Sequence, residues 1–243
     1  MVTLEKTNSE EEEQDEGHFD LHTLCSMFKR LCMMNYSSVA VRSELDVYED
    51  LWETNKDIAT RTLNSDFLKL MQHGSLKAER YINFTLQDIN YVLKVTQMLK
   101  TMSEKVKVPE DLSSFLQGRY KSYKSFADSL LNQYFLKDVP AIKPTPAMAQ
   151  YLSDYRNTMK KDPIYFAVAL LPCSRLWVWL AQKAAIEPNN AYYSWKKDNM
   201  YGHPEKHYKA LLNKYLDTHE KVTEANKIFR KQMGNEYNFF ASS

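Results

Sequence analysis

The sequence predicts an all-α protein, a bundle of about eight to ten helices. Three observations indicate this. Glycine is scarce, with 5 in 243 residues. Long stretches contain neither glycine nor proline, which favours helices over turn-rich β structure. Apolar residues recur at helical spacing, and no alternating runs typical of strands appear. No internal repeat is visible.

The first third of the chain divides into a tail and several helices. Residues 1–17 are acidic and polar and are expected to be a disordered tail, followed by a single helical domain over 18–243. Apolar spacing predicts a helix over about 18–34, with Phe19, Leu24, Phe28, Leu31 and Cys32 on one face. Helical spacing continues through Leu45, Leu51, Ile58 and Leu63.

A short helix is expected next, then a turn at His73–Gly74 and a long helix with Ser75 as its cap. The remaining helical patterns cover residues 111–136, 146–160, 163–185, 190–200, 203–220 and 221–240. The connectors "DVPAIKPTPAM" and "IEPNN" carry prolines, which end helices.

Bulk properties bound the class of protein. The net charge of +1 gives no indication of nucleic acid or an anionic membrane as a partner. The odd number of cysteines, Cys25, Cys32 and Cys173, argues against a disulfide framework and fits a reducing compartment. No signal-peptide pattern opens the chain. The expected location is therefore the cytoplasm.

The run "FAVALLPCSRLWVWLAQKA" is the most apolar part of the chain. Pro172, Arg175 and Gln182 interrupt it, so it is interpreted as a buried helix rather than a membrane span of roughly 18–20 apolar residues. A proline inside a helix costs about 3 kcal/mol, which suggests a bend selected for something other than packing. Cys173 follows that proline and lies near Trp177 and Trp179. It is either a small buried hydrophobe or part of a pocket.

Two further segments carry candidate functional residues. In "LQDINYVL", Asp88 and Tyr91 are three residues apart and share a helix face. That face is either exposed to solvent or buried with partners. In "NEYNFFASS", Glu236 lies among aromatic residues and is either a general acid with a raised pKa or part of a frayed end.

Signals for metals and other cofactors are weak. His203 and His207 are four residues apart, but no HExxH motif accompanies them, so a surface helix is the expected reading. Cys25 and Cys32 are expected in the core. Phosphate-binding glycine loops and nucleophile–base triad signatures are absent from the sequence. No cofactor or metal is therefore expected.

Taken in order, these segments resemble the TenA/thiaminase II family. The matching pieces are "SDFLKLMQHGSLKAERYINFTLQD" with "INY", "KPTPAMAQYL", "ALLPCSRLW" and the terminal "NEYNFF", which together run from about Asp50 to Phe240. The resemblance implies a haem-oxygenase-like all-α fold. It also implies an enzyme that cleaves the bond between the pyrimidine methylene and the nitrogen substituent of thiamin or degraded thiamin.

The resemblance assigns roles to individual residues. Cys173 corresponds to the nucleophile, Asp88 to the pyrimidine-binding aspartate and Glu236 to the acid/base glutamate. Tyr91 and Tyr151 correspond to tyrosines near the substrate. The residue types suit the chemistry, because a thiolate can add to an electron-poor pyrimidine while carboxylates hold its nitrogens and move protons.

Aromatic residues complete the expected pocket. Phe84, Tyr91 and Trp177 are expected to sandwich the flat ring and shield the cationic thiazolium. The tyrosine that follows a family tryptophan has no direct counterpart after Trp195. Either Asn199 replaces it or Tyr201, two residues later, reaches the site.

Other departures leave the substrate and the acceptor open. "KSYKSF" at residues 121–126 replaces a family helix segment containing Glu and His, and the acidic N-terminal extension is atypical of the compact bacterial members. Water as acceptor gives a thiaminase II-type hydrolase. An organic base or thiol as acceptor gives a thiaminase I-type transferase.

Two alternatives from other classes remain. One is a metal-dependent oxidase with the haem-oxygenase-like fold, which needs several Glu, Asp and His on facing helices. The other is a non-catalytic helical binding protein, in which Cys173, Asp88 and Glu236 lie apart. The expected partner is a small molecule, with neither nucleic acid nor membrane involved, and the resemblance implies a homo-oligomer, a tetramer by analogy.

Overall fold

The computed structural model of the chain describes residues 45–134 and 142–243. The expected tail at 1–17, the helix predicted over 18–34 and the cysteines Cys25 and Cys32 lie outside these residues. Residues Asp46–Ser243 form one compact unit.

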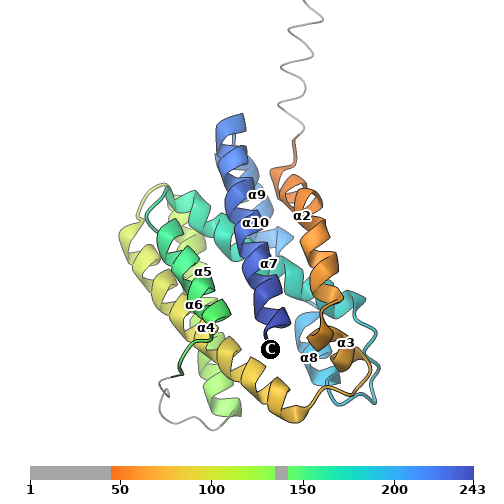
Figure 1. Cartoon of the computed structure of the whole chain (residues 1–243). Helices are drawn as coiled ribbons and strands as arrows, with labels where there is room; N and C mark the ends of the chain where they lie inside the picture. The colour runs from red at the N-terminus through yellow and green to blue at the C-terminus, as the bar shows by residue number, and fades with distance from the viewer. Residues whose placement is uncertain (1–44, 135–141) are drawn as a thin grey trace, which may run out of the picture. The chain divides into compact units, whose positions relative to one another are not determined.

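The described residues form nine helices and contain no strand, which confirms the all-α prediction. The helices, labelled as in Figure 1, are α2 (Val47–Leu63), α3 (Asp66–Gln72), α4 (Ala78–Lys105), α5 (Glu110–Gln133), α6 (Pro146–Thr158), α7 (Pro163–Lys183), α8 (Tyr193–Asn199), α9 (Glu205–Tyr215) and α10 (His219–Ala241).

The apolar helix α7 lies at the centre of the packing and contacts α2, α5, α6, α8, α9 and α10. Its residues from Phe166 to Leu171 are fully buried, as an apolar run on all faces of a helix requires. Asp162 caps its first turn and Pro163 occupies the first helical position, where a missing N–H costs nothing. Pro172 lies inside this helix, which continues to Lys183.

Two groups of helices surround this centre. The long helices α4 and α5 pack against each other, and α6 packs against α4, α7 and α10. On the other side, α2 packs against α9 and α10 (Figure 1). The C-terminal helix α10 therefore joins the two sides, because it contacts α2, α6 and α7.

The turn between α3 and α4 differs from the prediction in its capping residue. Gly74 has φ +68°, a left-handed conformation that favours glycine, so the turn at His73–Gly74 is confirmed. Helix α4 begins after Lys77, which makes no side-chain capping bond, so the expected cap at Ser75 is wrong. The chain stays extended between the turn and the helix, which delays the first helical turn.

Within the described residues, α7 is also the one helix long and apolar enough to cross a membrane by length and composition alone. The sequence predicted that the interruptions, Pro172 and Arg175 among them, would leave no apolar stretch of that length, and this prediction is wrong. Most of the helix is buried inside the protein, as is typical of a core helix.

Candidate active site

A cavity of about 710 Å³ opens between α4, α5, α7 and α8. Its described wall is largely aromatic and polar. It consists of Tyr81, Phe84, Thr85, Asp88, Tyr91, Val92, Ser122, Tyr123, Phe126, Ser129, Leu130, Gln133, Tyr134, Cys173, Ser174, Trp177, Val178, Ser194, Trp195, Asp198, Asn199 and Gly202. A volume in the range of small-molecule sites and several convergent polar groups mark it as the candidate active site.

Helix α7 presents Cys173 to this cavity. The Cys173 side chain is half-buried, and Trp177, one turn later on the same helix face, also lines the cavity. Pro172 has no N–H, so the carbonyl one turn earlier loses its usual intrahelical donor. The thiol and the tryptophan therefore belong to a pocket wall, as one of the two interpretations of this run predicted, whereas Pro172 is buried beside them and does not line the cavity.

Helix α4 supplies a carboxyl group, that of Asp88, to another wall of the cavity. Asp88 and Tyr91 both line the cavity, which excludes a fully solvated face for this pair. Burial raises the pKa of Asp88 to about 7, and the nearby Glu236 charge acts in the same direction. Because no hydrogen bond from the described residues reaches Asp88, its carboxyl group remains available to a ligand.

Glu236 lies beneath the cavity on α10 and is only 1% exposed. Tyr151 donates a hydrogen bond of 2.6 Å to its Oε1, and Trp177 Nε1 donates one of 3.1 Å to its Oε2. Burial raises the pKa of Glu236 to about 7, although hydrogen bonds from Tyr151, Trp177 and Cys173 oppose the rise. A carboxyl group with this pKa can accept or donate a proton at neutral pH.

The pKa of the Cys173 thiol is shifted upward, whereas an activated cysteine has a lowered pKa. Burial raises its pKa well above the ordinary value, and the negative charge of Glu236 adds to the rise. Hydrogen bonding with Tyr91 and Tyr123 partly offsets it. Cys173 is therefore a thiol at rest, and it needs a neighbouring base before it can act as a nucleophile.

Buried tyrosines connect the two catalytic candidates. The hydroxyl groups of Tyr91 and Tyr155 are 2.8 Å apart, and the rings of Tyr151 and Tyr155 stack at 5.2 Å. Burial raises the pKa of all three, so they remain neutral. Tyr151 is 1% exposed and does not line the cavity. It supports Glu236 from behind, which corrects the expectation that it lines the pocket.

Aromatic rings form one wall of the cavity, as predicted for Phe84 and Trp177. Their rings stack with centroids 5.9 Å apart and planes inclined by 24°. Phe239 on α10 stacks on Phe84 at 4.7 Å and fixes that ring from behind. Such a rigid aromatic wall suits a flat heterocycle.

The structure decides between Asn199 and Tyr201. Asn199 lines the cavity and donates a hydrogen bond to the Trp195 carbonyl. Tyr201 is 70% exposed and is not part of the cavity wall, so it does not lie where the prediction placed it. The chain turns after α8, and Gly202 there lies so close to Val178 that a Cβ would be only 2.5 Å from the valine Cγ2.

Many of the cavity residues were not among the predicted site residues, and three of them are informative. Tyr123 lies within "KSYKSF", the segment whose departure from the family left this wall of the pocket open, so no residue of it was chosen as a candidate. Trp195 and Asp198 come from the short helix α8. A pattern of seven residues is too short to show which helix face is buried.

Arg175, by contrast, has a structural role on another face of α7. Its guanidinium donates a hydrogen bond of 2.8 Å to the Tyr48 carbonyl and forms an ion pair with Glu49. It also lies over the rings of Tyr48 and Trp52. The arginine within the apolar run therefore joins α7 to α2.

Metal-ligand candidates do not converge in the residues described. No group of three or more His, Cys, Asp and Glu side chains that could hold a metal ion occurs there. His203 pairs with Glu205 at 3.1 Å, and the exposed His207 lies on α9. Burial and the charge of Arg119 lower the pKa of His207.

The cavity wall also has a characteristic charge. Among its described residues it contains the carboxyl groups Asp88 and Asp198, and no lysine, arginine or histidine. A thiol, two carboxyl groups and several aromatic rings therefore face one space, with a third carboxyl group, Glu236, directly behind it. Such a wall favours a cationic or electron-poor aromatic ligand.

The protein is thus a helical bundle whose cavity combines a thiol with carboxyl groups. Comparison with known proteins identifies its family. Residues 52–243 match the TENA/THI-4/PQQC family. The chain therefore belongs to this family. None of the curated proteins compared with the chain matches it.

Solved structures agree with this assignment. A TenA homologue from P. horikoshii is 22% identical, with a TM-score of 0.67 over 81% of this chain and 97% of its own. A TenA homologue from Pyrococcus furiosus is 16% identical, with a TM-score of 0.67 over 80% of this chain and 98% of its own. A protein described as a TenA family transcription regulator from Silicibacter is 12% identical, with a TM-score of 0.69 over 81% of this chain and 95% of its own. Identities this low show a shared fold.

Proposed function

We propose that the protein cleaves the bond between the pyrimidine methylene carbon and the nitrogen substituent of thiamin or a related aminopyrimidine. The observation that carries the proposal is the meeting of Cys173 and Asp88 in one cavity with Glu236 directly behind it. Membership of the TENA/THI-4/PQQC family supports it. A non-catalytic helical protein gives no reason for these three groups to converge.

The charge of the cavity supports a cationic substrate. Asp88 and Asp198 face the space without a described cation, and the stacked rings of Phe84 and Trp177 offer their electron-rich faces. In thiamin the thiazolium carries the positive charge. Its departure as a neutral thiazole removes that charge from the bond that breaks.

The first step of the proposed mechanism is activation of the thiol. Glu236, with a pKa of about 7, accepts the proton of Cys173 as the sulfur bonds to a ring carbon of the pyrimidine. The same carboxyl group then gives the proton to a ring nitrogen. Asp88 binds the amino group and a neighbouring ring nitrogen and stabilises the charge that develops there.

The second step is loss of the substituent. The bond from the methylene carbon to the nitrogen breaks, and its electron pair leaves with the nitrogen. Water adds to the methylene carbon and loses a proton. The carbon–sulfur bond then breaks with its electron pair on the sulfur, and the ring nitrogen returns its proton through Glu236 to the sulfur, which restores the aromatic ring and the thiol. An organic base in place of water gives the transferase.

The proposal is tested by measuring thiamin loss and pyrimidine product formation with the purified full-length protein, with and without pyridine or aniline. We expect cleavage in the wild type and a loss of about 10³-fold or more in Cys173→Ser. Ser125→Ala, an exposed serine of α5 outside the cavity wall, is the control and retains full activity.

The acceptor follows from the same experiment. Cleavage at full rate without base identifies the hydrolase, and cleavage that requires base identifies the transferase. No cleavage of thiamin or of an aminopyrimidine analogue under either condition rejects the proposed function, and so does full activity in Cys173→Ser.

A further inference from the structure

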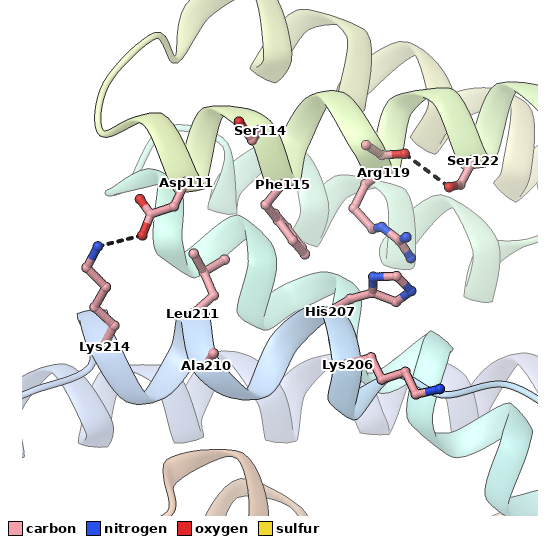
Figure 2. A pocket seen from close by; sticks show the side chains of 11 residues that line it. Asp111, Ser114, Phe115, Arg119, Ser122, Lys206, His207, Ala210, Leu211 and Lys214 are labelled. Carbon is pink, nitrogen blue, oxygen red and sulfur yellow. Dashed lines mark hydrogen bonds and ion pairs between the residues drawn. The ribbon is translucent and has the colours of Figure 1, made fainter.

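A second hollow of about 450 Å³ lies between α5 and α9 (Figure 2). It is lined by Asp111, Ser114, Phe115, Gly118, Arg119, Ser122, Lys206, His207, Ala210, Leu211 and Lys214. We call it the α5–α9 groove. Figure 2 shows Arg119 from α5 and His207 from α9 pointing toward one another across it.

Arg119 differs from the other half-buried arginines of the described chain. Arg80 pairs with Asp66 at 2.8 Å, and Arg175 pairs with Glu49. Arg119 forms no ion pair within residues 45–134 and 142–243, although it is also half-buried. Withdrawing a guanidinium from water without a carboxylate partner is unfavourable, so an external anion would be stabilised there.

Two other groups at this end of the groove are also donors. Lys206 lines it without an ion pair in the described residues, and the His207 ring faces the same space. The Ser122 hydroxyl, by contrast, donates its hydrogen to the Gly118 carbonyl at 3.0 Å (Figure 2). The groove's one carboxylate, Asp111, lies at the far end (Figure 2), where it is bonded to Lys214 and Tyr215. The unpaired charge near Arg119 is therefore positive.

We propose that the α5–α9 groove binds a phosphate group, with Arg119 as its principal ligand and Lys206 and His207 as further donors. A guanidinium presents two parallel N–H groups that match two phosphate oxygens. An ammonium and an imidazole N–H supply donors for the remaining oxygens. Three donors of different types suit a tetrahedral anion better than a planar carboxylate.

The groove adjoins the catalytic cavity. Ser122 lines both hollows. The buried Tyr208 hydroxyl, which is hydrogen-bonded with Arg119, lies 3.3 Å from the hydroxyl of Ser174, the residue after Cys173. The phosphate group therefore has two chemical sources, a free phosphate or the phosphorylated end of a substrate whose ring occupies the cavity. The second source rests on the proposed function.

The binding test uses the full-length wild-type protein and inorganic phosphate or diphosphate, measured by titration calorimetry and by ³¹P NMR line broadening. We expect saturable binding that weakens about 10- to 100-fold in Arg119→Met. Met keeps the length of the apolar stem, and a thermal melt of the variant checks its fold. Lys206→Met is expected to weaken binding by a smaller factor.

The matched control is Lys121→Met. Lys121 is an exposed cation on the same helix that does not line the groove, so its loss removes the same charge at a different place. Unchanged binding in Lys121→Met supports the site. The absence of saturable binding, or equal weakening in Arg119→Met and Lys121→Met, overturns the proposal.

The source of the phosphate is distinguished by kinetics. If it belongs to the substrate, Arg119→Met raises the KM for thiamin monophosphate about tenfold or more and leaves the KM for thiamin unchanged. If it is free, phosphate binds without competing with either compound. The binding measurement needs no turnover, so failure of the proposed function does not affect its outcome.

Discussion

The catalytic cavity and the α5–α9 groove share Ser122 but have opposite charges. Among described residues, the cavity holds Asp88 and Asp198 without any cation. The groove holds Arg119 and Lys206, and its one carboxylate is bonded elsewhere. One helix, α5, thus separates a space for cationic or electron-poor ligands from a space for anions.

Burial shifts the pKa of the titratable groups in opposite directions at the cavity and in the groove. Burial raises the pKa of Glu236 and Asp88 to about 7 because no cation lies beside them to stabilise the charged form. In the groove, burial and the Arg119 charge instead lower the pKa of His207. Burial therefore prepares Asp88 and Glu236 for proton transfer near neutral pH, whereas in the groove it favours the neutral form of His207 beside the Arg119 guanidinium.

The largest expected effect is on catalysis. Glu236→Gln keeps the shape of the side chain and removes its ability to transfer a proton. We expect thiamin cleavage to fall by about 10²- to 10⁴-fold, mainly in kcat. Glu187→Gln, an exposed glutamate after α7, is the control and keeps wild-type rates. Wild-type kcat in Glu236→Gln contradicts an acid/base role for this residue.

The same substitution has a second expected effect, on stability. The pKa of Glu236 is raised from 4.5 to about 7 by folding, so the folded state binds its proton more tightly than the unfolded state does. Its contribution is fully present below about pH 4.5 and is lost as the pH rises to about 7. Through this one group the wild type therefore loses about 3 kcal/mol over this range.

Glu236→Gln lacks this loss, so the difference in free energy of unfolding between variant and wild type moves in favour of the variant as the pH rises. Urea titrations across that pH range measure it, with Glu187→Gln again as the control. This outcome needs no substrate. A variant whose stability follows the wild type at every pH contradicts a raised pKa for Glu236.

A smaller effect is expected when the groove is made more like the cavity. Ala210 is exposed and lines the groove on α9, one turn after His207. Ala210→Asp adds a carboxylate beside the unpaired cations and is expected to weaken phosphate binding about tenfold. Ala210→Asn has nearly the same size without the charge and leaves the affinity unchanged. Equal affinities in the two variants contradict charge as the basis of binding.

The helices and the main chemical groups were predictable from sequence. Helical spacing and the lack of glycine gave the fold class, and α7 was recognisable as a core helix because it is apolar on all faces. Cys173, Asp88 and Glu236 were each ambiguous alone, and the family resemblance placed them together. The structure then put Cys173 and Asp88 in one cavity and Glu236 behind it.

What sequence could not give depends on contacts between distant helices. Tyr151 was correctly predicted to belong to the site but wrongly predicted to line the pocket, since spacing along α6 does not reveal that it packs against Glu236 of α10 and against the ring of Tyr91, which does line the cavity. Tyr201 and Asn199 are two residues apart, and only the turn after α8 decides which faces the site. The groove could not be predicted from the sequence because Arg119 and His207, which face each other across it, come from separate helices.

The smallest expected effect concerns the two hydrogen bonds that hold Glu236. Both Tyr151, at 2.6 Å, and Trp177, at 3.1 Å, donate to the carboxylate and therefore favour its charged form. Tyr151→Phe and Trp177→Phe each remove one donor. The pKa of Glu236 is then expected to rise above about 7 by about half a unit to one unit.

The measurement is the pH dependence of the cleavage rate. The midpoint that is present in the wild type and absent from Glu236→Gln belongs to Glu236, whether this residue acts as acid or as base. It is expected to move to higher pH in both variants, and further in Tyr151→Phe, whose hydrogen bond is shorter and more deeply buried. A midpoint that moves to lower pH contradicts stabilisation of the carboxylate by these donors. A larger shift in Trp177→Phe than in Tyr151→Phe contradicts the expected order of the two hydrogen bonds.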